Sequence, residues 1–377
     1  KNEGNILPLK KKGKIALIGP LADTRNNIAG TWSVAQVPSK YTTIKEAMEH
    51  ALDGKATLLY AQGSNIWRNQ ELQKNGELGK PINWGDETEM KNEALKIAKE
   101  ADVIVCAMGE SADMSGECGS RTNLEMPDVQ HELLAELVKL GKPVVLLNFA
   151  GRPTVLTWEK QHVPAIMNVW FGGSEMGDAL CDVLFGDKVP SGKLTTSMPK
   201  TTGQEPIYYN HQNTGRPVAD DNKKFAKFAS NCLDVSNGPL YPFGYGLSYT
   251  TFEYSNFRLS CQEADINGNQ EATEWQNGKN ITATITVKNT GNRDADEIVQ
   301  LYIRDMVSSI SRPVKELKGF QRIHLAVGES KEVSFEITPD MLKFYNADLK
   351  HIIEPGDFQI MIGTNSKEVE ALNFNVK

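Results

Sequence analysis

The feature that most limits the fold is a series of short apolar runs in the first half of the chain, separated by helix-like patterns. The runs are the length of single strands and are apolar on both faces, as in parallel strands that helices cover on both sides. Five such runs occur: KIALIG (14–19), ATLLYAQG (56–63), ADVIVCAMG (101–109), KPVVLLNFAG (142–151) and AIMNVWFGG (165–173).

Helical spacing fills the intervals between these runs. Segment 127–141 has Pro127 in the expected first turn and Gly141 at the expected end. Its apolar residues recur at steps of three and four, at Val129, Leu133, Leu137 and Leu140. Similar patterns occupy 43–52, 88–101 and 175–186. Alternating strands and helices predict an α/β fold whose mainly parallel sheet has helices on both faces.

The second half of the chain follows a different pattern. Residues 187–250 are rich in Gly, Pro, Tyr and Ser, which is typical of a long ordered connection. Further on, the stretches ITATITVKN, EVSFEI and FQIMIG alternate with period two, so that Ile281, Ala283, Ile285 and Val287 share one face. We therefore predict an α/β domain over 1–250, including the connection, and an antiparallel β-sandwich over 251–377.

Composition excludes several classes of function. The net charge of -7 over 377 residues argues against a nucleic-acid partner. No apolar run approaches the roughly 18 residues that a membrane helix needs. The five cysteines lack CxxC spacing and the six histidines are scattered, which argues against a metal site and a disulfide scaffold. The turn GPLADTRNN after the first run lacks the GxGxxG fingerprint, which disfavours a flavodoxin-like binding protein as an alternative.

The stretch GESADMSGECGSRTNLEMP (109–127) places charged groups directly after the third apolar run. Ligands of open α/β sheets bind outside the carboxyl ends of the strands, where this loop is expected. Two interpretations stay open on the residues alone: a solvated polar connection, or a loop that presents a carboxylic acid to a substrate. His211 is a second candidate, because YYNHQNTGRP surrounds it with the polar and aromatic residues of a sugar site.

Five ordered stretches carry a close resemblance to a known family. They are VIVCAMGESADMSGECGSRTNLEMPDVQ, GKPVVLLNFAGRP, WFGGSEMGDALCDVLFGDKVPSGKLTTSMP, PIYYNHQNTGRP and LYPFGYGLSYTTFEYSN. Together they resemble the later part of glycoside hydrolase family 3, in particular its periplasmic-type bacterial β-glucosidases. The resemblance covers nearly the whole chain and implies an α/β sandwich domain followed by a fibronectin type III-like domain. Thr195 departs from it, because the family usually has Pro there.

The resemblance also implies a division of catalytic roles. Family members of this type begin with a (β/α)8 barrel that carries the nucleophilic aspartate, and no such pattern precedes Lys1. The family's acid/base glutamate matches Glu117, with Glu110 as the rival position. Glu110 is then expected to fix the shape of the loop, and Arg121 to orient it by bidentate pairing with one of these acids.

The resulting expectation is part of a retaining, exo-acting β-glucosidase that hydrolyses terminal β-linked sugars of glycosides without a cofactor or metal. Its partners would be a β-linked oligosaccharide or glycoside and an N-terminal barrel of the full-length protein, with a homodimer left open. The resemblance implies a periplasmic or secreted protein. The alternative is a non-catalytic carbohydrate-binding or scaffolding fragment.

Overall fold

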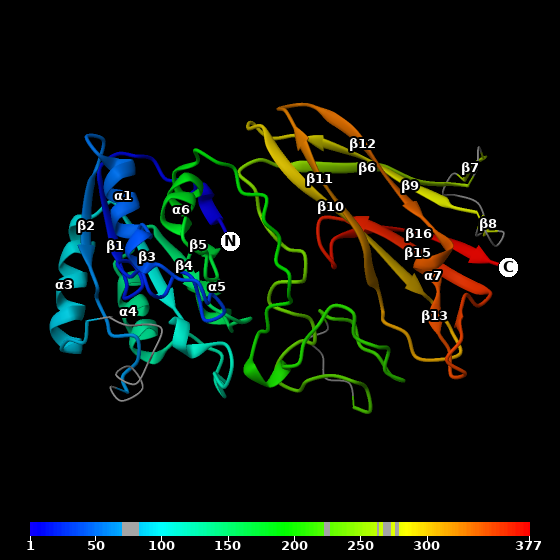
Figure 1. Ribbon diagram of the computed structural model, residues 1–377, viewed down its shortest axis with the longest axis horizontal. Coiled ribbons are helices and arrows are strands. Elements are labelled where there is room, and N and C mark those ends of the chain that lie inside the picture. Colours follow the sequence, from blue (N-terminus) through cyan, green and yellow to red (C-terminus); the bar gives the residue numbers. More distant parts are fainter. Residues whose placement is uncertain (70–82, 222–226, 262–263, 267–272, 276–278) are drawn as a thin grey trace. The chain divides into compact units, whose positions relative to one another are not determined.

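The computed structural model describes residues 1–69, 83–221, 227–261, 264–266, 273–275 and 279–377. The chain divides into two compact units (Figure 1). The first, here the α/β unit, comprises Lys1–Lys188 and Pro199–Gly203, and the second, the sandwich unit, comprises Val189–Met198 and Gln204–Lys377. Most of the connection predicted at 187–250 therefore groups with the second unit.

The α/β unit is built on one parallel sheet with strand order β2-β1-β3-β4-β5. Its strands are β1 (Lys14–Ile18), β2 (Thr57–Ala61), β3 (Val103–Gly109), β4 (Val144–Phe149) and β5 (Ala165–Asn168). Each lies within one of the five predicted runs. The central strands β3 and β4 are buried almost throughout, which explains why their sequences are apolar on both faces.

The described helices beside the sheet are α1 (Ile44–Leu52), α3 (Glu87–Glu100), α4 (Asp128–Val138), α5 (Thr157–His162) and α6 (Met176–Phe185). Helix α1 contacts α6, and α3 contacts α4. The chain moves outward from β1 to β2 and in the opposite direction from β3 to β4. Right-handed crossovers therefore place α1 and α4 on opposite faces of the sheet (Figure 1). The predicted α/β architecture is confirmed.

Two details differ from the expected helices. Helix α4 begins at Asp128, and Pro127 is its N-cap in an extended conformation, so the proline lies just before the first turn rather than within it. Helix α5 was not predicted, because its six residues are too short to show a clear helical period. Short 3-10 turns are present at Glu3–Asn5, Pro38–Lys40, Ala112–Met114 and Thr202–Gln204.

In the residues described, the sandwich unit contains two sheets and a small hairpin. One sheet has the order β11-β10-β15-β16-β8, the other β12-β9-β6-β7, and β13 pairs with β14. The pairs are antiparallel except for the short pair between β16 and β8. The elements are β6 (Phe252–Cys261), β7 (Ala264–Ile266), β8 (Thr273–Trp275), β9 (Ile281–Asn289), β10 (Ala295–Asp305), β11 (Glu316–Leu325), β12 (Ser330–Ile337), α7 (Pro339–Leu342), β13 (Phe344–Tyr345), β14 (His351–Ile352), β15 (Gly356–Gly363) and β16 (Val369–Val376).

One core lies between these two sheets. It joins side chains of β9 and β12 with those of β10, β15 and β16. All four residues predicted to share a face of β9 are buried in it, as the period-two pattern requires. The predicted all-β second domain is confirmed.

Part of the connection is held on the sandwich unit by hydrogen bonds that its backbone carbonyls accept. Val314 N–H donates to the carbonyl of His211, and Ser366 N–H donates to that of Phe243. The side chain of Gln300 donates to the carbonyl of Gly244. These bonds explain why residues 204–250 belong with the sandwich. Among the described helices, none is both long and apolar enough to cross a membrane.

Candidate active site

The acidic loop (110–127) leaves the carboxyl end of β3 beside the neighbouring ends of β1 and β4. The chain leaves β1 toward one edge of the sheet and β3 toward the other, so this is the position where the strand order reverses and ligands bind in such folds. Gly109 ends β3 with φ of +130°, and a Cβ there would lie 2.1 Å from the carbonyl oxygen of Phe149. A glycine is therefore required for β3 and β4 to end so close together.

Glu110 lies at the centre of a buried ion network with Arg121 and Arg152. One of its oxygens, Oε1, accepts a hydrogen bond from Arg121 Nη1 at 2.8 Å and lies 3.1 Å from Arg152 Nε. The other oxygen, Oε2, accepts from the backbone N–H of Gly151 at 3.1 Å. The Glu110 side chain is 1% exposed. Such a carboxylate is stable only because charged and hydrogen-bonded partners surround it.

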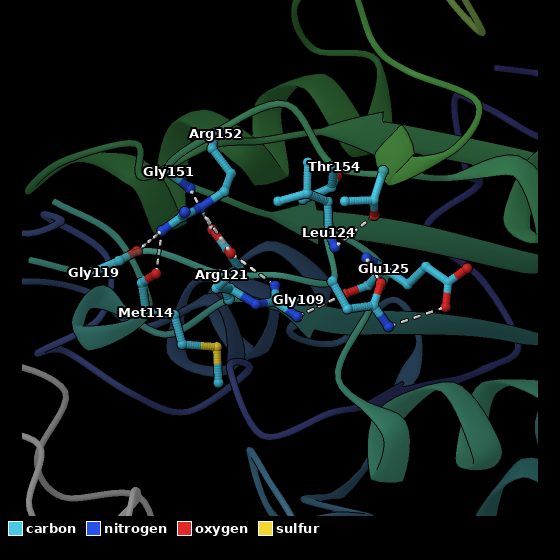
Figure 2. A network of polar contacts seen from close by, with 12 residues as sticks. Gly109, Met114, Gly119, Arg121, Leu124, Glu125, Gly151, Arg152 and Thr154 are labelled. Carbon is cyan, nitrogen blue, oxygen red and sulfur yellow. Dashed lines mark hydrogen bonds and ion pairs between the residues drawn. The ribbon is translucent and has the colours of Figure 1, made fainter. Parts of the chain in front are cut away.

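The two arginines extend this network into the backbone of the loop. Arg152 Nη2 donates to the carbonyls of Met114 and Gly119, the latter at 2.5 Å. Arg121 Nη2 donates to the carbonyl of Glu125 at 2.9 Å. Arg121 thus uses one nitrogen for Glu110 and another for the backbone, so its pairing is not the bidentate fork expected from sequence. Figure 2 shows Arg121 and Arg152 approaching the shared carboxylate from different sides.

The segment after β1 supports the acidic loop from another side. Thr31 Oγ1 lies 2.5 Å from the carbonyl oxygen of Ala112 and 2.8 Å from that of Ser115. The N–H of Ala112 donates to Asn27 Oδ1 at 2.9 Å, and Asn27 is fully buried. Gly116 lies against Thr31 so closely that a Cβ would approach its methyl group to 2.5 Å. The first half of the loop is therefore fixed at several points.

Helix α4 fixes the beginning of the loop through Gln130. Its Oε1 accepts from Gly109 N–H at 2.8 Å, and its Nε2 donates to the carbonyls of Gly109 and Ile66 at 2.9 and 3.0 Å. Gln130 is fully buried, so these three bonds satisfy its amide where water has no access. The end of β3 is thereby joined to α4 and to the segment that follows β2.

Glu117 lies on the same loop as Glu110 but is neither buried nor held by a network. It is exposed, and it lies between Gly116 and Cys118, which both have positive φ values of +96° and +60°. In the described part of the chain it makes no hydrogen bond or ion pair. Because nothing occupies its oxygens, this carboxyl group is available to exchange a proton with a ligand.

His211 belongs to the sandwich unit and is not part of this network. It is exposed, its Nδ1 lies 3.1 Å from the carbonyl oxygen of Gln212, and its own carbonyl accepts from Val314 N–H. Its role near a sugar therefore stays a prediction. The structure brings together Glu110, Arg121 and the loop that carries Glu117.

Four contributors to this site were not recognised from sequence: Arg152, Gln130, Thr31 and Asn27. Arg152 had a usable signal, because it follows β4 directly and the carboxyl ends of adjacent parallel strands share one edge of the sheet. Gln130, Thr31 and Asn27 gave none, since a polar residue on a helix or in a loop is ordinary. Over the residues that the structure describes, no group of three or more His, Cys, Asp or Glu side chains is arranged to hold a metal ion.

Comparison with known proteins agrees with this architecture. The model of the glycosyl hydrolase family 3 C-terminal domain matches residues 1–249, and that of the fibronectin type III-like domain matches residues 297–366. A "Periplasmic beta-glucosidase" of Salmonella typhimurium is 44% identical over 100% of this chain and 48% of its own length. A "Beta-xylosidase" of Formosa agariphila is 35% identical, again over 100% of this chain and 48% of its own.

A solved structure gives the same result in three dimensions. The crystal structure of a β-glucosidase from Listeria innocua in complex with glucose superposes with a TM-score of 0.85 and 34% identity, covering 100% of this chain and 47% of that one. The chain thus spans about half the length of these relatives. The resemblance predicted from sequence is confirmed, and the chain belongs to glycoside hydrolase family 3, with the family's C-terminal domain and a fibronectin type III-like domain.

Proposed function

We propose that this chain is the part of a retaining, exo-acting β-glucosidase that supplies the general acid/base, Glu117, while an N-terminal (β/α)8 barrel supplies the nucleophile. Relatives named as β-glucosidases match this chain over about half of their own length, which leaves room for a barrel domain. Retaining glycosidases place their two carboxyl groups about 5–5.5 Å apart, one on each side of the scissile bond. In this protein the two groups come from different domains.

The observation that carries the proposal is the contrast between the two glutamates of the acidic loop. Glu110 is buried and bound by two arginines and a backbone N–H, so it cannot approach a substrate without breaking that network. Glu117 is exposed on the same loop. It protonates the oxygen of the departing group in the first step and deprotonates the attacking water in the second.

The substrate class proposed is a glycoside with a terminal β-linked glucose, which the names of the β-glucosidase relatives support. Because another relative is named a β-xylosidase, β-xylosides are the substrates to compare with β-glucosides. The protein is proposed to be periplasmic or secreted, on the support of the relative named as periplasmic.

The test uses the full-length enzyme that contains this chain and two kinds of β-glucoside. The dinitrophenolate of a dinitrophenyl glucoside departs with little protonation, whereas the alkoxide of an alkyl glucoside needs a proton from the acid. Glu117→Ala should lower the rate on the alkyl glucoside by about 10²–10⁴-fold and spare the first step on the dinitrophenyl substrate. Deglycosylation then lacks its base, so azide should restore turnover on the activated substrate.

Glu110→Gln is the matched comparison, because it alters a carboxylate of the same loop. We expect it to affect both substrates to a similar extent and to gain nothing from azide. If Glu110→Gln instead showed the dependence on leaving group and the azide effect, the catalytic role would belong to Glu110. If neither variant showed them, this loop would have no part in proton transfer.

A further inference from the structure

We infer that Arg152 is a positioning residue that sets where the carboxyl group of Glu117 stands, by joining the two ends of the loop tip that carries it. The inference rests on the proposed function of Glu117. Arg152 follows the end of β4 and lies 33 residues beyond Gly119 in the sequence.

The tip is residues 115–118, and Arg152 contacts the backbone on both sides of it. Its Nη2 donates to the carbonyl of Met114, immediately before the tip, and to that of Gly119, immediately after it. One nitrogen atom thus joins the two ends of the tip. Glu117 is exposed within the tip, so its position depends on how these ends are held rather than on contacts of its own.

The guanidinium is itself fixed from its other edge. Arg152 Nε lies 3.1 Å from Glu110 Oε1, and Glu110 is held in turn by Arg121 and by Gly151 N–H. A planar guanidinium presents several donors in a rigid arrangement, which an ammonium group on a flexible chain does not reproduce. The buried carboxylate therefore orients Arg152, and Arg152 transmits that orientation to the tip.

Arg121 provides a matched control on the same network. It also pairs with Glu110, but its second hydrogen bond goes to Glu125, beyond the tip. Both arginines are mostly buried, with side chains 11% exposed for Arg121 and 20% for Arg152. Loss of either cation should disturb the loop as a whole, but only loss of Arg152 removes the donor that contacts the carbonyls on both sides of the tip.

Loss of Arg152 should therefore slow substrates whose leaving group needs a proton more than substrates whose leaving group does not. A displacement of about 1 Å in a catalytic group can cost on the order of 10²-fold in rate. A displaced Glu117 protonates a leaving oxygen poorly, whereas a leaving group that needs no proton is little affected. A residue with only a structural role would lower the amount of folded enzyme, and hence the rate on every substrate, by the same factor.

The test compares Arg152→Met, Arg152→Lys and Arg121→Met in the full-length enzyme, on the alkyl and the dinitrophenyl glucoside, with rates expressed per folded molecule. For Arg152→Met we expect kcat/KM on the alkyl glucoside, which reports the first step, to fall on the order of 10²-fold, with a much smaller fall in kcat/KM on the dinitrophenyl glucoside. Arg152→Lys should fall between Arg152→Met and the unaltered enzyme. Arg121→Met should leave the ratio of the two rates per folded molecule unchanged.

Glu117→Ala, measured alongside, separates this inference from the proposed function. If Glu117→Ala shows no dependence on the leaving group, the proposed function fails first. If Glu117→Ala shows it, but the Arg152 variants change both substrates equally or not at all, the positioning role of Arg152 is refuted. Should Arg152→Met not fold, Arg152→Lys alone decides the outcome, because it retains the charge but not the fork.

Discussion

Removal of the Glu110 carboxylate should destabilise the α/β unit far more than removal of the Glu117 carboxylate. The two glutamates belong to one loop, yet one is buried within a network and the other is exposed. We therefore compare Glu110→Ala with Glu117→Ala in this chain. The pair separates stability from chemistry, since the dependence on the leaving group and the azide effect are expected of the Glu117 variant and not of a Glu110 variant.

The expected magnitude follows from what Glu110→Ala leaves behind. Arg121 and Arg152, at 11% and 20% side-chain exposure, would lose their carboxylate partner with little water to replace it. Breaking a buried ion pair by removing one partner costs about 3–5 kcal/mol. In a unit of this size each kcal/mol lowers the melting temperature by roughly 2–4 °C, so the expected decrease is roughly 6–20 °C. Glu117→Ala removes an exposed side chain and should change the free energy of unfolding by no more than about 0.5 kcal/mol.

Tryptophan fluorescence during thermal and urea unfolding measures this difference. Five of the six tryptophans precede residue 189, so the signal reports mainly on the α/β unit. Equal melting temperatures of Glu110→Ala and Glu117→Ala would refute the reasoning, because a buried carboxylate that two arginines contact cannot be removed without cost. A large loss of stability in Glu117→Ala would show that its carboxylate has partners in solution.

Two further predictions concern the chain as a whole and its response to pH. This chain alone should not hydrolyse an aryl β-glucoside, because an acid without a nucleophile cannot form the glycosyl intermediate; turnover at the rate of an ordinary glycosidase would contradict this. The hydrogen bond with buried Glu159, aided by the charges of Glu159, Glu125 and Glu132 and opposed by burial, raises the pKa of His131. The resulting stabilisation should be complete below the ordinary pKa of about 6.5 and be lost as pH rises through the raised value. The difference in unfolding free energy between the unaltered chain and His131→Gln, measured in urea, should therefore be larger at pH 6 than at pH 8. An equal difference at both pH values would show that the pair of His131 and Glu159 does not cause it.

The fold was predictable from the sequence to the level of its layers but not of its strand order. Each strand of the parallel sheet lies within a short apolar run that ends at a glycine, which is a strong local signal. Strand order depends on contacts between distant segments, and no local pattern encodes it. Helix α5 was missed because its six residues give too little periodicity.

Some contacts of the site lie within one loop and could be predicted from sequence, whereas others join distant segments and could not. The second kind distinguishes the two glutamates, so spacing alone could not separate them. Glu110 and Arg121 belong to one loop, so their proximity was foreseeable. Arg152 reaches Glu110 across 42 residues, because the register of β3 and β4 pairs Gly109 with Phe149 and brings the residues after both strands together. This long-range pairing gives Glu110 a second cation and a backbone N–H donor. A carboxylate with so many partners is a structural group, and the register that creates these contacts leaves Glu117 as the exposed acid of the loop.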